Sequence, residues 1–364
     1  MYGFEPSEEQ RMLMDAAERF ATNQLRAAGR ESDESGELPQ ALIEKGWELG
    51  VLQASIPEAY GGFGEHSAVT GALAAEAMAW GDLSGTLAVM APTSYVIPIL
   101  LGGTEEQKKT LIPPVIEDEW KPYVAAYVEP VFDFHEGDMQ TTAEAKKGGF
   151  QLNGVKTMVP FADRAEAFLV FAMLDGTLRA FSVPAGTSGL TIGEREPLLG
   201  LRALPTYRLT LENVALDQDA LIGGSEEFNA SRIVASSQVA IAAMAIGLSK
   251  GALDYALPYA KEREVWGVPI AQKQSIAFML AEMAIEIESN RLLVWEAAWK
   301  LDEGDPDAPQ AAYLAFSGAA DTAMMVTDRA VQTLGGHGYV REHPVEMWMR
   351  NGRGIPIMPG LAMV

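Results

Sequence analysis

Residues 328–364 read DRAVQTLGGHGYVREHPVEMWMRNGRGIPIMPGLAMV, and they join two helical patterns through a glycine-rich turn. Gly335, Gly336 and Gly338 permit positive φ angles and leave main-chain amides open to a close approach. Amides at a turn beside a helix start form an anion site, so the arrangement suits a phosphate. A glycine cap between two helices is the simpler interpretation, and the spacing alone favours it.

The same stretch resembles the C-terminal signature of the acyl-CoA dehydrogenase family, Q-x-x-G-G-x-G-Y followed by R-x-x-P-x-E and an arginine-rich helix. Gln332 to Tyr339 match its first part. The resemblance implies a flavin adenine dinucleotide (FAD) cofactor that lies between subunits. In that family a Tyr-Glu-Gly-Thr run a few residues later supplies the catalytic base. Here the run reads M-P-G-L, and Pro359 stands in place of the glutamate.

Composition limits the classes of partner. The 364 residues carry a net charge of −23, with a sequence pI of about 4.5. Nucleic acid and anionic membranes are therefore unfavourable partners, and a polyanionic CoA ester needs a locally basic site. The chain has no cysteine and only four separated histidines, which argues against disulfides and a metal site. We see no signal peptide or membrane-length apolar run, which predicts a cytoplasmic protein.

The sequence pattern divides the chain into three parts. Residues 1–118 are helical in character, with capping boxes at Ser7–Gln10 and Thr104–Gln107. Residues 119–224 carry alternating and β-branched runs, which predict a small antiparallel β-domain. Residues 225–364 return to helical periodicity and predict a four-helix bundle. This order, mainly α with a central β-domain, is the architecture of the acyl-CoA dehydrogenase family, and the resemblance covers essentially the whole chain.

Individual elements follow from the same patterns. Helices are expected over residues 7–28, 38–50, 67–80, 83–101, 104–113, 231–263, 270–301, 309–334 and 340–350. Strands are expected over residues 123–127, 140–145, 150–153, 167–173, 178–183 and 206–211.

One set of family motifs is largely present. In the family, one subunit's β-domain cradles the flavin ring while the neighbour's bundle holds the pyrophosphate and adenosine. Residues 263–267 resemble the family's R-x-x-F-G, with tryptophan for phenylalanine, and residue 274 falls on a family glutamine. An arginine fork suits a pyrophosphate because it makes bidentate, charge-assisted bonds. The resemblance implies these cofactor-binding residues: Arg263, Trp266, Gln274, Gln332, Gly335, Gly336 and Gly338.

The other set, which serves a subunit's own flavin ring, is almost wholly replaced. The family's T-E-P-x-x-G-S-D loop reads V-E-P-V-F-D-F-H here, so Val128 lacks a hydroxyl. Asp133 and Phe134 stand where Gly and Ser approach the ring and acyl group. The family's N-G-x-K-x-W-I-T reads N-G-V-K-T-M-V-P. Met158 replaces the stacking aromatic, and Pro160 offers neither a hydroxyl nor an N–H.

The second position that family members use for the base is also unsuitable. Some members carry it on the first bundle helix, just before an arginine, and that residue is Ser231 here. A serine cannot abstract an α-proton unaided, since a general base needs a pKa near the working pH. Neither Pro359 nor Ser231 can act as the general base, so we assign no catalytic residue.

Our leading hypothesis is a degenerate subunit that pairs with a catalytic homologue in an α2β2 tetramer and completes the partner's FAD site. By resemblance, the complex would dehydrogenate a bulky acyl-CoA, such as a steroid side-chain thioester, and pass electrons to an acceptor. One alternative is a self-sufficient homotetrameric flavoenzyme with a relocated base, or a monooxygenase-type relative. Another is a non-enzymatic acyl-CoA-binding or scaffold protein.

Overall fold

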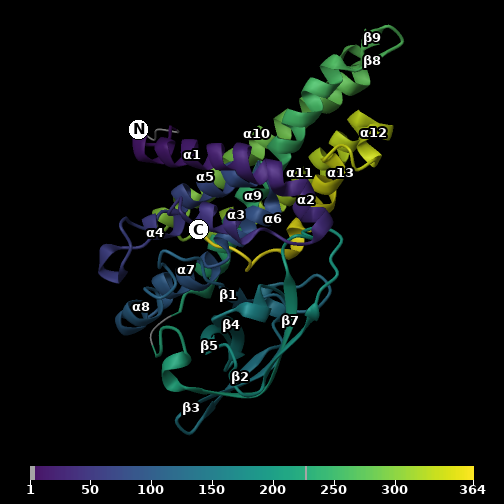
Figure 1. Ribbon diagram of the computed structural model, residues 1–364. Helices are drawn as coiled ribbons and strands as arrows, with labels where there is room; N and C mark the ends of the chain where they lie inside the picture. Colours follow the sequence, from purple (N-terminus) through teal and green to yellow (C-terminus); the bar gives the residue numbers. More distant parts are fainter. Residues whose placement is uncertain (1–4, 226–227) are drawn as a thin grey trace.

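The computed structural model describes residues 5–225 and 228–364. A helical N-terminal part, a β-sheet and a helical C-terminal part follow one another along the chain, as expected (Figure 1). The N-terminal helices are α1 (Glu8–Phe20), α2 (Arg26–Ser35), α3 (Gln40–Trp47), α4 (Val51–Ala54), α5 (Ala68–Ala79), α6 (Leu83–Met90), α7 (Thr93–Gly102) and α8 (Glu105–Leu111).

Both predicted capping boxes are confirmed. The Ser7 hydroxyl accepts from the Gln10 amide while the Gln10 side chain accepts from the Ser7 amide, and Thr104 pairs with Gln107 in the same way. The single helix predicted over residues 83–101 is wrong. It is two helices, α6 and α7, which are bent by 44° at a break that includes Pro92. Proline lacks the N–H that would continue the helical ladder.

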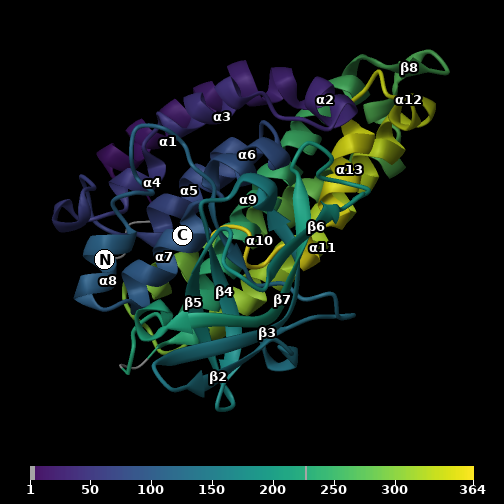
Figure 2. The same ribbon diagram turned by 60° about the horizontal axis from the view of Figure 1, so that its bottom comes forward.

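The middle part is one seven-stranded sheet with strand order β1-β4-β2-β3-β7-β6, and β5 pairs with β4. The strands are β1 (Tyr123–Ala126), β2 (Thr142–Lys146), β3 (Gly149–Pro160), β4 (Ala167–Leu174), β5 (Thr177–Pro184), β6 (Leu190–Arg195) and β7 (Thr206–Asp217). Figures 1 and 2 show the sheet beneath the helical layer.

Three expectations for this sheet are corrected. The sheet is mixed rather than purely antiparallel, because β4 pairs in parallel with both β1 and β2. A long connection joins β1 to β2 and lets both run alongside β4 in the same direction. The prediction also omitted β6, whose exposed residues 191–195 lack an alternating apolar pattern. The prediction ended the third strand, residues 150–153, at Asn153, whereas β3 continues to Pro160 through two register shifts.

The C-terminal part is built around the 33-residue helix α9 (Ala230–Glu262). The remaining elements are the hairpin β8 (Glu264–Val265) and β9 (Val268–Pro269), then α10 (Gln274–Asp302), α11 (Ala308–Leu334), α12 (Gly336–Tyr339) and α13 (Val345–Arg353). Both α11 and α10 pack along α9, and α13 packs on α11 and α9. The hairpin lies at the end of the molecule remote from the sheet, beside α12 (Figures 1 and 2).

By length and composition α9 could cross a membrane, and α6 with α7 would also pass if counted as one bent span. This is weak evidence, because 94% of the most apolar window of α9 is buried inside the protein. Helix α9 is the central helix of the fold.

Helix α9 approaches α5 so closely that only glycine fits at the contact. A Cβ at Gly247 would lie 2.2 Å from the main-chain oxygen of Glu76. Backbone cannot retreat from that contact without moving one of the two helices.

We therefore expect Gly247→Ala to destabilise the protein by about 1–3 kcal/mol, although alanine is the better helix former. Thermal denaturation followed by circular dichroism measures the change. Glu262→Ala on the exposed end of the same helix is the matched control and should stay near the wild-type midpoint. An unchanged midpoint for Gly247→Ala would show that α5 and α9 can separate freely.

Candidate functional site

A surface pocket of about 690 Å³ lies at the hairpin end of the bundle, and we call it the glycine-turn pocket. It is formed by the end of α9, the hairpin, the first turn of α10 and the turn between α11 and α12. Its lining residues are Tyr259, Arg263, Val265, Trp266, Ile270, Lys273, Ser275, Ile276, Thr333, Leu334, Gly335, Gly336 and His337.

The hairpin sets one wall of the pocket. Arg263 caps α9 in an extended conformation, and the chain then reverses through Trp266 and Gly267. Both have positive φ, 60° and 77°, as a tight two-residue hairpin turn requires. For a bulky side chain this conformation costs about 1–3 kcal/mol. Trp266 is nonetheless 91% exposed, so the fold presents an indole to solvent at a strained position.

The glycine turn sets the opposite wall. Gly335 has φ 61° and ψ −127°, a conformation open essentially to glycine alone. A Cβ at Gly335 or Gly336 would meet no atom within 4 Å, so these two glycines face open space. Gly338 is different: it is buried, and a Cβ there would lie 2.4 Å from the Val331 oxygen. Helix packing, rather than ligand approach, therefore accounts for Gly338.

Two tyrosine–histidine pairs brace this turn from α9. The Tyr259 hydroxyl lies 2.6 Å from Nδ1 of His337, and the Tyr255 hydroxyl lies 2.8 Å from Nδ1 of His343. The two imidazole rings are 5.5 Å apart. Because hydrogen bonds and ring contacts link α9 to α12, the turn is held in one position.

The charge of the glycine-turn pocket opposes that of the chain. Its described lining includes Arg263 and Lys273 but no carboxylate, although the whole chain carries −23. The N-terminus of the 29-residue helix α10 opens at Lys273 and Ser275 and adds a partial positive charge. This is the locally basic site that a polyanionic ligand needs.

The structure brings together four of the seven cofactor-binding residues predicted from sequence. Arg263, Trp266, Gly335 and Gly336 line the pocket. The remaining three, Gln274, Gln332 and Gly338, are not among its described lining residues.

Sequence reasoning missed five polar lining residues: Tyr259, Lys273, Ser275, Thr333 and His337. Tyr259 precedes Arg263 by one helical turn, which is a signal that could have been used. Lys273 adjoins the predicted Gln274, and His337 lies inside the glycine turn itself, but neither matches a motif position.

The second candidate region is the part of the β-domain that carries the family's own-ring motifs, which in the family form the cleft for a subunit's own flavin. In this region Lys156 and Glu129 form a fully buried ion pair of 2.9 Å. The Glu129 carboxylate also accepts from the amides of Gln140 and Thr141. Burial alone would raise the pKa of Glu129, but the Lys156 ammonium and these hydrogen bonds outweigh it and lower that pKa. Burial lowers the pKa of Lys156 to about 8.

Met158 and Pro160, which stand at family ring-contact positions, are both engaged within the β-domain. Met158 is buried with φ 58°, and its amide donates to the Glu196 carboxylate at 3.0 Å. The Thr157 hydroxyl donates to the other oxygen of Glu196. Pro160 is paired with Thr206 at the end of β3. The Glu129 and Glu196 carboxylates therefore serve as structural acceptors.

Aromatic side chains pack against one another in the same region. Phe134, which stands at the family's serine position, packs edge-on against Tyr127 at 5.6 Å. Tyr127 packs edge-on against Phe171 at 5.2 Å, and burial raises the pKa of its hydroxyl. The side chain at the family's serine position, Phe134, therefore packs against another aromatic ring of this chain.

Neither position considered for the base supplies one. Pro359 is half-buried, and Ser231 is exposed in the first turn of α9. Within residues 5–225 and 228–364, no group of three or more His, Cys, Asp or Glu side chains could hold a metal ion.

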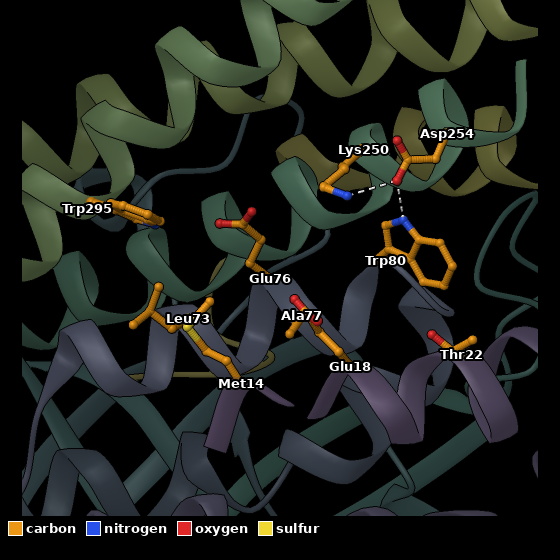
Figure 3. A pocket seen from close by; sticks show the side chains of 10 residues that line it. All are labelled: Met14, Glu18, Thr22, Leu73, Glu76, Ala77, Trp80, Lys250, Asp254 and Trp295. Carbon is orange, nitrogen blue, oxygen red and sulfur yellow. Dashed lines mark hydrogen bonds and ion pairs between the residues drawn. The ribbon is translucent and has the colours of Figure 1, made fainter. Parts of the chain in front are cut away.

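A further cavity of about 220 Å³ lies between α1, α5, α9 and α10 (Figure 3). Lys250 donates to Asp254 at 2.8 Å, and the Trp80 indole donates to the same carboxylate oxygen at 2.8 Å. Burial raises the pKa of Glu76, although Arg291 at 2.6 Å opposes the shift. None of the residues predicted from motifs lines this cavity.

Comparison with known proteins agrees with the fold. The models for the acyl-CoA dehydrogenase N-terminal, middle and C-terminal domains match residues 7–119, 126–214 and 228–362. The mitochondrial short-chain specific acyl-CoA dehydrogenase of Bos taurus is 34% identical over 98% of this chain and 88% of its own length.

Solved structures agree as well. Butyryl-CoA dehydrogenase from Megasphaera elsdenii superposes with a TM-score of 0.88 at 31% identity, covering 98% of this chain and 95% of that one. The FAD complex of PigA gives a TM-score of 0.88 at 26% identity with the same coverage. The matched domain models and the superposed structures together define an acyl-CoA dehydrogenase fold. The chain belongs to the acyl-CoA dehydrogenase family.

The buried ion pair at the base of the cleft makes a direct prediction. Glu129→Gln would leave the Lys156 ammonium buried without a counter-charge, at a cost of about 3–5 kcal/mol near pH 7. The difference from wild type should shrink as pH falls through the lowered pKa of Glu129, because a protonated glutamate is neutral like glutamine. It should also shrink above about pH 8, where Lys156 loses its proton.

Thermal midpoints measured from pH 3 to pH 9 test this. The exposed pair of Glu144 and Lys146 provides the control, and Glu144→Gln should match wild type throughout. A deficit for Glu129→Gln that stays constant with pH would contradict the ionic origin.

Proposed function

We propose that this chain is the non-catalytic subunit of a hetero-oligomeric acyl-CoA dehydrogenase and completes the FAD site of a catalytic homologue. One observation carries the proposal. The glycine-turn pocket, which in the family serves the neighbour's flavin, keeps its arginine and glycines in one basic site. The cleft that would serve the chain's own flavin has lost its hydroxyls, its stacking aromatic and its base. Substitutions that arose independently of function would not concentrate in the own-ring motifs while the glycine-turn pocket stays intact.

The residues of the glycine-turn pocket fit the nucleotide half of FAD. Arg263 and Lys273 would hold the pyrophosphate, assisted by the amides around Gly335 and Gly336. Trp266 offers an exposed indole face on which an adenine can stack. FAD accepts hydride from the thioester, and in this proposal the ring and the catalytic glutamate belong to the partner. This chain would bind and orient the cofactor without moving a proton.

An exposed apolar row on α10 supports a partner subunit. Phe278, Ile285 and Leu292 follow one another at seven-residue spacing, and each is more than half exposed. That spacing places them on one face of the helix, as in a helix–helix seam. Exposed apolar side chains in a row mark an interaction surface. A homologous subunit, packed through its own bundle, is the occupant we propose.

The finer parts of the proposal rest on resemblance to heterotetrameric members of the family. The complex would be α2β2 and would form the α,β-double bond of a bulky acyl-CoA, such as a steroid side-chain thioester. It would work in the cytoplasm and pass electrons to a separate electron-transfer protein.

The flavin-to-polypeptide ratio tests the proposal directly. We expect the chain expressed alone to be colourless, and the complex with its catalytic homologue to contain about one FAD per two chains. Flavin absorbance combined with native mass determination measures both. A homotetramer with one FAD per chain would refute the proposal and support the alternative hypothesis of a self-sufficient flavoenzyme.

Two substitutions test the assignment of the two sites within that complex. Arg263→Ala should weaken FAD retention about tenfold to hundredfold, since a charge-assisted bond contributes about 1.5–3 kcal/mol. Lys261→Ala, two residues earlier and exposed, is the matched charge control and should retain FAD as wild type does. Met158→Ala in the β-domain cleft should also leave FAD in place. Loss of flavin from Met158→Ala would show that the chain's own cleft holds the ring.

A further inference from the structure

The cavity between α1, α5, α9 and α10 is separate from both candidate cofactor regions, and its described lining shares no residue with the glycine-turn pocket (Figure 3). Its volume is about 220 Å³. Because a cavity of about 150 Å³ accepts benzene, this one admits an organic molecule of about nine non-hydrogen atoms. A single π-helical turn, Ala21–Leu25, follows α1 and contributes Thr22 to the lining. Such turns occur frequently at functional sites.

Acidic side chains outnumber basic ones around the cavity. Its described lining carries three carboxylates, those of Glu18, Glu76 and Asp254. Lys250 contributes an ammonium to the same lining, and Arg291 pairs with Glu76 at 2.6 Å from outside it. With both cations counted, the carboxylates remain in the majority. The cavity therefore favours a positively charged molecule over an anion.

The carboxylates differ in how far the protein already satisfies them. Asp254 accepts from Lys250 and from the Trp80 indole, both at 2.8 Å. Glu18 is exposed and lines the cavity from α1. Within residues 5–225 and 228–364 its carboxylate forms no ion pair or side-chain hydrogen bond. Glu18 is thus the carboxylate at the rim that remains available to a bound cation.

Trp295 supplies an unpartnered donor at the opposite end from Lys250 and Asp254 (Figure 3). Its Nε1 is buried and has no hydrogen-bond partner in the described part of the chain. Burial raises the pKa of Glu76, and Arg291 and then the Trp295 N–H oppose that rise, so the N–H lies toward this carboxylate. A ligand hydroxyl between the two could accept from the indole and donate to the carboxylate. Tryptophan also has the aromatic face that attracts organic cations most strongly.

We propose that this cavity binds a small organic cation that carries a hydroxyl, of the choline class. Glu18 and the Trp295 face would attract the ammonium, while the Trp295 N–H and Glu76 would hold the hydroxyl. A free cation fits better than a phosphate-bearing headgroup, because carboxylates repel phosphate. The proposal goes beyond the proposed function and does not depend on it, since the site needs neither FAD nor a partner subunit.

Choline chloride is the probe, and isothermal titration calorimetry on the full-length chain at constant ionic strength is the measurement. We expect choline to bind at least about fivefold more tightly than its uncharged analogue dimethylbutanol, in which carbon replaces the nitrogen. It should also bind about threefold to tenfold more tightly than tetramethylammonium, which lacks the hydroxyl. Absence of choline binding, or equal binding of choline and dimethylbutanol, would overturn the proposal. Phosphocholine that bound as tightly as choline would overturn the assignment to a free cation.

Two variants separate the roles of the hydroxyl and the charge. Trp295→Phe keeps an aromatic face but removes the N–H, so the preference for choline over tetramethylammonium should disappear. Glu18→Gln should weaken choline about twofold to fivefold, as expected for an exposed charge pair, and leave dimethylbutanol unaffected. Glu9→Gln is the matched control and should bind as wild type does. Glu9 is exposed on α1 nine residues earlier, which places it on the opposite face of the helix.

Glu18 and Glu9 are both exposed, so their variants should fold and keep the test valid even if Trp295→Phe does not. Equal weakening by Glu18→Gln and Glu9→Gln would show a general effect of surface charge and overturn the proposal. Unchanged choline binding in Glu18→Gln would contradict it as well. The flavin content of the chain has no bearing on these outcomes, so the choline site and the proposed function stand or fall separately.

Discussion

The structure depends on the burial of α9. Its residues 233–249 are almost all inaccessible, and α5, α10, α11 and α13 pack around it. Close approach is possible because glycine and alanine fill the contact surface, so backbone meets backbone at Gly247. A helix enclosed in this way fixes the positions of whatever lies at its ends. Both regions of functional interest are at those ends.

The two ends of α9 meet opposite demands. At its C-terminus, Tyr259 and Arg263 enter an open, basic pocket with a strained hairpin beside it. Toward its N-terminus, Ser236 and Ser237 bind the main chain of a buried segment. The C-terminal end presents polar side chains at an open pocket. Near the N-terminal end, the serine hydroxyls bond to the protein's own main chain. Under the proposed function, this division would let one fold keep half of a cofactor site and close the other half.

Much of the fold followed from local chemistry. The capping boxes at Ser7 and Thr104 and the long apolar periodicities predicted the helices, since side-chain hydrogen bonds and packing faces are local signals. The parallel pairing of β1 with β4 could not be predicted, because register depends on residues distant in sequence. The pocket showed the same limit. Motif spacing identified Arg263 and the open glycines, but Lys273 and His337 enter through tertiary folding. Motif spacing also could not show that Gly338 is required for helix packing rather than for ligand approach.

The exposed Trp266 gives the protein a built-in optical reporter. Of seven tryptophans it alone is almost fully exposed, while the others described are buried or half-buried. Indole emission moves to shorter wavelength when the ring leaves water, so the red edge of the spectrum belongs chiefly to the hairpin tip. Any molecule that covers that tip would change the colour of the emitted light without a label. Binding of a ligand or partner at the tip could therefore be followed in real time in unmodified protein.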